Sequence, residues 1–322
     1  MKLGVFTVLL ANQSLDEALA YLKGLGVEAV EIGCGGFPGT AHCDAVKFLK
    51  DQSLIKQFQE TIKKHGMMVS ALSVHGNPVH PQPEIAAKFH QEFEAAVQLA
   101  AELEIDTVVT FSGCPGDSED AKYPNWVTCP WPDDFLKILK WQWEERLIPY
   151  WQKTAEFTKK YGVNKIALEL HPGFCVYNPE TLLRLRAAVG DIIGANLDPS
   201  HLFWQGIDPV AAIRELKGAI YHFHAKDTKI DFYNTSRNGV LDTKHYGHED
   251  QRSWLFRTVG YGHAEETWRA ICSELQLAGY DHVISIEHED SLMTPTEGLE
   301  KAVAFLQRVM IFEQKPKGMW WA

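Results

Sequence analysis

Short apolar runs alternate along the whole chain with longer stretches whose apolar residues recur at helical spacing. The predicted strands lie within 2–9, 29–34, 67–75, 106–112, 165–172, 193–201, 219–227 and 282–288. The predicted helices are 15–25, 54–65, 83–103, 143–161, 179–189, 209–216, 265–278 and 295–312, and several end at a glycine. Eight strand–helix units in this order predict an α/β chain folded as a (β/α)8 TIM barrel.

A doubly wound open sheet is the alternative fold for such alternation. That fold would place a glycine-rich phosphate loop after an early strand, directly before a helix. The stretch GCGGFPG at 33–39 is superficially similar, but no helix with the required glycine spacing follows it. We interpret it as a loop that brings backbone close to the site, which favours the barrel.

Two predicted connections, 113–142 after the fourth strand and 228–263 after the seventh, are much longer than usual. Long loops at this end of a barrel commonly form lids or substrate walls. Aromatic and polar residues alternate in both, which suits the faces of a sugar, although packing of the loops is an equally open explanation. Trp131 and Arg257 are the candidate substrate contacts in these loops. We assign 1–313 to the barrel and 314–322 to a C-terminal tail, whose tryptophans are expected to cover a surface patch or a neighbouring subunit.

Composition and charge narrow the possible partners. The 322 residues are 45% hydrophobic, which is enough for one large core. A formal charge of −11 opposes binding to nucleic acid or to an anionic membrane. No apolar run approaches the ~20 residues of a membrane span, and the short one at the N-terminus passes directly into a helix start. Six cysteines without a CxxC pair are typical of reduced thiols, so we expect a cytoplasmic protein.

The last four predicted strands each end in a side chain that can bind a metal. These residues are Glu169, Asp198, His224 and Glu287. The carboxyl ends of barrel strands converge, and three unpaired carboxylates placed together would repel one another unless a proton or a cation is bound. Any one of them alone could be an ordinary polar strand end, but four on successive strands predict a divalent-metal site. Oxygen donors with one imidazole suit Mn²⁺ or Mg²⁺, with Co²⁺ or Zn²⁺ also compatible, and no cysteine is present for structural zinc.

Further polar residues are predicted to face the same mouth of the barrel. His201 lies one helical turn beyond Asp198, where it could bind the metal or a substrate oxygen. His171 lies two residues from Glu169, and period-two alternation gives both the same inward face. The remaining candidate substrate contacts are Lys226, His75 and Asn77. His222 lies deeper in its strand and is interpreted as a hydrogen-bonded core histidine.

The motifs ELHP, LDPSH, HFHAKD and SIEHED, in this order, resemble those of the xylose-isomerase-like TIM barrels. This superfamily of sugar isomerases and epimerases also includes inosose dehydratases and class II apurinic endonucleases, and the resemblance covers essentially the whole chain. It implies that Glu169, Asp198, His224 and Glu287 hold the metal and that His201 binds substrate. It also implies that the two glutamates act as acid and base on opposite faces of a sugar.

The predicted function is a divalent-metal-dependent sugar isomerase or epimerase, with Mn²⁺ the preferred ion. It would move a proton next to a carbonyl through a metal-stabilised enediolate. A lyase or dehydratase that eliminates a β-substituent from 3-keto-glycosides or inososes is the alternative. A non-catalytic sugar-binding barrel stays open, whereas an endonuclease is disfavoured because the fourth strand ends TVVTFSG, without histidine. The expected partner is a small sugar, with a homo-oligomer or a partner subunit left open.

Overall fold

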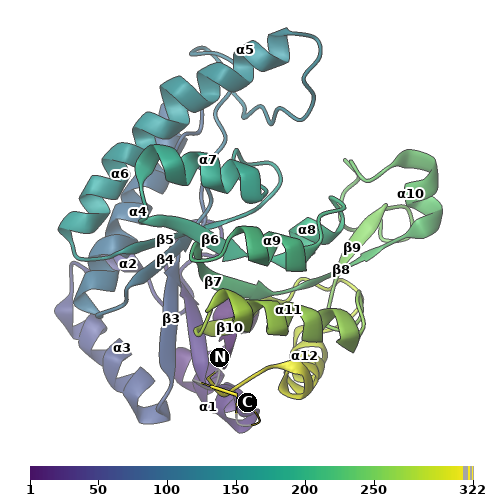
Figure 1. Ribbon diagram of the computed structural model, residues 1–322. Coiled ribbons are helices and arrows are strands. Elements are labelled where there is room, and N and C mark those ends of the chain that lie inside the picture. The colour runs from purple at the N-terminus through teal and green to yellow at the C-terminus, as the bar shows by residue number, and fades with distance from the viewer. Residues whose placement is uncertain (315–317, 320, 322) are drawn as a thin grey trace.

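Eight parallel strands close into a barrel in a computed structural model that describes residues 1–314, 318, 319 and 321 (Figure 1). The order around the barrel is β1-β10-β7-β6-β5-β4-β3-β2, so that β1 pairs with both β2 and β10. This order confirms the predicted TIM barrel. The strands are β1 (Lys2–Phe6), β2 (Ala29–Gly33), β3 (Met68–Ser73), β4 (Thr107–Thr110), β5 (Lys165–Glu169), β6 (Ile193–Leu197), β7 (Ile220–Ala225) and β10 (Val283–Ile286).

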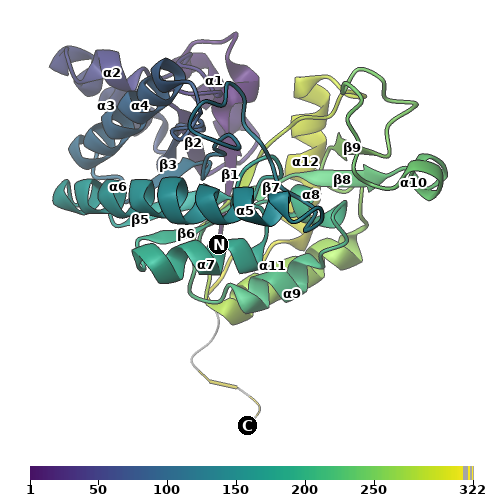
Figure 2. The ribbon, with the colours of Figure 1, turned by 90° about the horizontal axis from the view of Figure 1, so that it is seen from above.

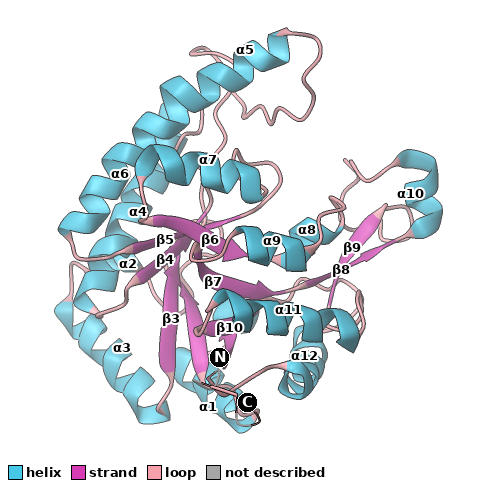
Figure 3. Ribbon diagram, viewed as in Figure 1, coloured by secondary structure: helices cyan, strands magenta, loops and turns pink. Residues whose placement is uncertain are grey.

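The helices surround the barrel and bury their apolar faces against the strands (Figure 3). The two ends of these helices follow local capping rules. In α1, Ser14 and Glu17 form a reciprocal capping box, and at the end of α3 Gly66 adopts the left-handed conformation (φ 61°) that closes the helix. The helices on the outside of the barrel are α1 (Leu15–Gly24), α2 (Ala45–Phe48), α3 (Gln52–His65), α4 (Pro83–Glu102), α6 (Ile148–Lys160), α7 (Pro179–Val189), α9 (Pro209–Glu215), α11 (Glu265–Ala278) and α12 (Pro295–Val309).

The two long connections contain secondary structure that the sequence pattern did not predict. After β4, helix α5 (Asp134–Trp141) continues through a π-helical turn (Gln142–Leu147) into α6, so helix begins well before the predicted 143. After β7, the chain forms β8 (Asp227–Ile230), α10 (Phe232–Asn238) and β9 (Trp254–Arg257). Strands β8 and β9 pair antiparallel and, with α10, project away from the barrel (Figures 1 and 2). We call the segment 227–263 the excursion.

A buried carboxylate fixes the return of the excursion to the barrel. Asp227 is fully buried, and its Oδ2 accepts hydrogen bonds from the backbone N–H groups of Gly260, Gly262 and His263, at 3.0, 3.1 and 2.9 Å. A Cβ atom at Gly262 would come within 2.4 Å of Asp227 Oδ1, so this close approach requires glycine. The excursion is therefore held at a defined place beside the mouth of the barrel.

Two further expectations concern the outside of the barrel. Within the described ranges, the chain contains no helix whose length and apolarity would suffice to cross a membrane. Of the predicted tail 314–322, residues 315–317, 320 and 322 lie outside the described residues. The expectation that its tryptophans cover a surface or a neighbouring subunit, and the boundary at 313, therefore stay predictions.

Candidate metal centre

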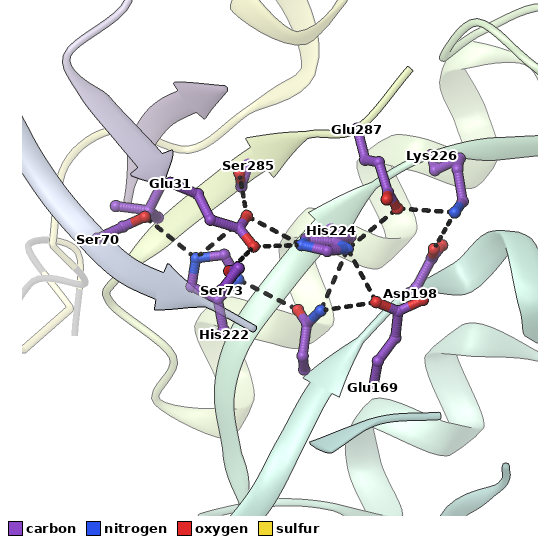
Figure 4. A network of polar contacts seen from close by, with 12 residues as sticks. Glu31, Ser70, Ser73, Glu169, Asp198, His222, His224, Lys226, Ser285 and Glu287 are labelled. Atoms are coloured by element: carbon purple, nitrogen blue, oxygen red, sulfur yellow. Dashed lines mark hydrogen bonds and ion pairs between the residues drawn. The ribbon is translucent and has the colours of Figure 1, made fainter. Parts of the chain in front are cut away.

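The four predicted metal ligands come together at the carboxyl ends of four neighbouring strands (Figure 4). Glu169 ends β5, His224 lies in β7, and Glu287 follows β10. Asp198 follows β6 and caps the short helix α8 (Pro199–Phe203) by accepting from Ser200 N at 2.8 Å. One ligand atom from each residue lies within 4.8 Å of the others, and all but the partly exposed Glu287 are buried. These four residues are called the cluster below.

Glu31, on β2, contacts His224 on the side of the ring that faces away from Glu287. The sequence did not predict this contact. Its two carboxylate oxygens lie 2.9 and 3.0 Å from His224 Nε2, and one of them accepts from Ser285 Oγ at 2.8 Å. Burial alone would raise the pKa of the Glu31 carboxyl, but the imidazoles of His224 and His222 outweigh burial and lower this pKa to about 2. Because Glu31 occupies Nε2 of His224, the other ring nitrogen, Nδ1, is the one that faces the cluster. Nδ1 lies 3.1 Å from Glu287 and 3.5 Å from Glu169. The second ring nitrogen thereby faces the carboxylates of the cluster, where it could ligate a divalent ion.

Asp198 is incompletely hydrogen-bonded for a buried carboxylate. Its Oδ2 is buried and accepts no hydrogen bond from any residue the structure describes, although Lys226 Nζ and His201 Nε2 lie 3.1 and 3.4 Å away. Burial raises the pKa of this carboxyl, the negative charges of Glu169 and Glu287 add to that effect, and the pKa reaches about 7. Three carboxylates and an imidazole, with one carboxylate oxygen that accepts no hydrogen bond, form a set of ligand atoms that fits a divalent cation.

Two histidines hold the Glu169 carboxylate in place. His75 Nε2 lies 2.9 Å from Oε2, and His201 Nε2 lies 3.0 Å from Oε1. Burial would raise the pKa of Glu169, but hydrogen bonds from His201 and His75 keep that pKa well below its ordinary value. Burial lowers the pKa of His201 to about 3, so its imidazole is neutral near pH 7. His171 packs against the His201 ring with centroids 4.1 Å apart, so all three predicted histidines lie at the site.

Lys226 brings a buried cation to the edge of the cluster. Its Nζ lies 2.7 Å from Glu287 Oε2 and 3.0 Å from Glu289 Oε2, and the side chain is 2% exposed. Burial would lower the pKa of the ammonium, but Asp198 and the two glutamates outweigh burial and raise it well above its ordinary value. Lys226 therefore offsets part of the negative charge and presents a donor next to Glu287.

Three predicted substrate contacts lie apart from the cluster. Both ends of the Asn77 amide bind the backbone of Cys114, which leaves this side chain holding the loop after β4. Arg257 pairs with Asp290 at 3.0 Å, and Trp131 is 74% exposed. None of these three lines the two cavities beside the cluster, so their role in binding stays a prediction without a supporting contact. His222 is a core histidine as interpreted, contacting Ser70 and Asn196.

Two cavities flank the cluster. The smaller, of about 170 Å³, is lined by both glutamates of the cluster together with His75, Glu289 and an apolar wall that includes Phe6, Phe37 and Phe111. The larger, of about 430 Å³, lies on the side of His171 and His201. Because His75 and His201 bind opposite oxygens of Glu169, this carboxylate stands between the two cavities.

Known proteins are similar to this chain in sequence or in structure. YfiH, an uncharacterized protein of Bacillus subtilis (strain 168), is 37% identical over 312 residues, which are 96% of this chain and 99% of YfiH. The solved structure of the IOLI protein with a bound zinc atom has a TM-score of 0.65 at 21% identity, covering 96% of this chain and 98% of that chain. A D-tagatose 3-epimerase-like protein has a TM-score of 0.63 at 21% identity, with the same two coverages. The model of the xylose isomerase-like TIM barrel family matches residues 19–309, and the chain belongs to this family.

Proposed function

We propose that the chain is a divalent-metal-dependent sugar isomerase or epimerase that moves a proton on a carbon next to a carbonyl. The observation that carries the proposal is the pair Glu169 and Glu287, which line one small cavity and also belong to the cluster. A divalent ion held by the cluster would stabilise the negative charge that develops on the sugar oxygens when that proton leaves. Mn²⁺ suits three carboxylates and one imidazole, and the zinc bound to the similar IOLI structure supports a divalent ion in this fold.

The protonation states of the two glutamates support proton transfer. Glu169 is kept ionised by His201 and His75, so it can accept a proton from carbon. Burial would raise the pKa of Glu287, but Lys226 and His224 outweigh burial and hold that pKa well below its ordinary value. Removal of the carbon proton by one carboxylate, followed by return on the opposite face from the other carboxylate after that group has taken up a solvent proton, gives epimerisation. Return to the neighbouring carbon gives isomerisation.

The surroundings of the smaller cavity suit a neutral sugar. Phe6, Phe37 and Phe111 offer an apolar wall to the face of a sugar ring. His75 lines this cavity and can hydrogen-bond a substrate oxygen. His201, 3.0 Å from Glu169, and Lys226, 2.7 Å from Glu287, are the further donors beside the two carboxylates. The same enediolate could instead expel a β-substituent, so a lyase is the chemical alternative that the test must separate.

Solvent isotope exchange tests the proposal directly. The protein, loaded with Mn²⁺, is incubated in D₂O with a panel of ketoses and 3-keto-glycosides, and the recovered sugars are analysed by NMR and mass spectrometry. We expect deuterium on the carbon next to the carbonyl, together with an epimer or an aldose–ketose isomer. Release of an aglycone or of water identifies a lyase. Absence of both exchange and elimination with every sugar overturns the enzymatic proposal in favour of a sugar-binding barrel.

A further inference from the structure

Much of the lining of the larger cavity comes from the two long connections, and the rest comes from the segments that follow β5 and β6. Trp126 comes from the loop after β4, while Tyr246 and Trp254 come from the excursion. Trp204, which follows α8, stacks on Trp254 with centroids 4.7 Å apart and an interplanar angle of 6°. Trp126 packs against the same aromatic group. Flat aromatic walls of this kind bind the apolar faces of sugar rings.

Two donors at this cavity lack partners. The indole N–H groups of Trp126 and Trp204 are buried and have no hydrogen-bond partner in the described part of the chain, and both residues line the cavity. A buried indole N–H normally finds an acceptor, so these two require one from elsewhere. Thr128 and Thr243 add hydroxyl groups to the same lining. Aromatic faces combined with unsatisfied donors and hydroxyls match a polyhydroxylated ring.

The charge of the lining argues against a phosphorylated ligand. Among the residues that the structure describes, no lysine or arginine lines the larger cavity, whereas Asp242 does. Burial would raise the pKa of Asp242, but hydrogen bonds from Lys244 and Ser253 outweigh burial and lower this pKa to about 2. Asp242 is therefore ionised, and it pairs with Lys244 Nζ at 2.8 Å, so the two charges offset each other and neither is free to hold a phosphate group.

The larger cavity adjoins the reaction centre. His201 lines it, and His201 Nε2 lies 3.0 Å from the Glu169 carboxylate that borders the smaller cavity. We propose that the larger cavity binds the second ring of a disaccharide whose first ring carries the keto group and reacts at the cluster. The substrate class would then be neutral keto-disaccharides rather than free keto-hexoses. This inference rests on the proposed function and narrows it.

The test compares a keto-hexose with the matching keto-disaccharide. The probes are 3-keto-D-glucose and 3-keto-maltose, and the readout is deuterium incorporation with kcat and KM for each. The variants are Trp126→Phe and Trp204→Phe, which keep an aromatic plane but remove the donor. Trp141→Phe serves as the matched control, because Trp141 lines neither cavity. Thr243→Val, at an exposed position, replaces the tryptophan variants if these do not fold.

We expect a lower KM for the disaccharide and, in each tryptophan variant, a rise of about 3- to 10-fold in that KM, as loss of one hydrogen bond predicts. The KM for 3-keto-glucose and both values of kcat should not change, and Trp141→Phe should match the parent. Equal KM values for both probes, insensitive to the variants, would overturn the second-ring site while the proposed function stands.

If no deuterium exchange is found, a binding measurement tests the second-ring site separately from the proposed enzymatic function. Isothermal titration of the parent protein with maltose measures occupancy of the larger cavity without turnover. If neither probe exchanges deuterium but maltose binds, and Trp204→Phe weakens that binding, the enzymatic proposal fails and the second-ring site stands as a sugar-binding site. If neither exchange nor maltose binding is found, both proposals are wrong.

Discussion

His224 Nε2 lies 2.9 Å from a carboxylate oxygen of Glu31, on the side of the imidazole ring opposite to Glu287. A charged acceptor at Nε2 fixes which nitrogen carries the proton and makes Nδ1 the better ligand. The pair joins β2 to β7 across the inside of the barrel, and both side chains are fully buried. The alignment of one proposed metal ligand therefore depends on a strand that contributes no ligand to the cluster.

Glu31→Gln should lower the affinity for Mn²⁺ by about 10- to 100-fold, because losses of this size follow removal of the partner of a ligating histidine. Titration calorimetry on the metal-free protein measures the change. Ser285→Ala is the control, since it removes only one neutral donor to Glu31 and should have a smaller effect. Unchanged affinity in Glu31→Gln, with an intact fold by circular dichroism, would show that this carboxylate does not orient the ligand.

Glu169→Gln and Glu287→Gln should each reduce turnover by at least about 100-fold, the lower end of what acid–base catalysis contributes. An amide cannot accept the proton from carbon, whereas its shape preserves the packing of the cluster. Deuterium exchange under saturating Mn²⁺ gives the rate, and metal content is measured on the same samples. A variant that binds the ion and keeps a near-normal rate would contradict the two-carboxylate mechanism.

Chelation should abolish activity, and added Mn²⁺ should restore it. Without an ion, the carboxylates of the cluster repel one another, and Lys226 offsets only part of their charge. We therefore also expect the midpoint of thermal unfolding to fall after treatment with EDTA and to recover with Mn²⁺. Activity and a melting temperature that are both indifferent to chelation would contradict a metal at the cluster.

The barrel and the cluster could be predicted because both follow from local patterns. A buried parallel strand has a recognisable apolar run, and its carboxyl end is where a residue such as Glu169 or His224 meets its counterparts. Repetition of that pattern on four strands predicted that the four side chains of the cluster lie together, without knowledge of any contact. The same reasoning predicted that His222, which lies two residues before His224 in β7, is a core histidine.

Glu31 escaped prediction because nothing in its surroundings marks it. It is one carboxylate inside the apolar run AVEIG, and its partner His224 is 193 residues away in the sequence. Arg257 was selected from its place in an aromatic-rich loop, and the sequence did not reveal that it pairs with Asp290, so its role as a substrate contact stays a prediction. In both cases the outcome depends on long-range contacts, which periodicity does not encode.

The excursion depends on one further carboxylate, which provides the last prediction. Asp227 Oδ2 accepts from three backbone N–H groups and from Trp268 Nε1 at 3.2 Å. Asp227→Asn either turns an amide N–H₂ toward these donors or loses the charge that strengthens the bonds. The free energy of unfolding should fall by about 3 kcal/mol, because buried donors left unsatisfied cost about 1–3 kcal/mol each.

Urea denaturation measures that change, and Asp231→Asn is its matched control. Asp231 caps α10 in the same excursion but is exposed, and asparagine caps a helix as well as aspartate, so its substitution should be nearly neutral. Because the excursion also carries Tyr246 and Trp254, Asp227→Asn should raise the KM for a keto-disaccharide more than the KM for a keto-hexose. If Asp227→Asn lowers the free energy of unfolding but leaves the ratio of the two KM values unchanged, then Asp227 anchors the excursion without affecting substrate recognition.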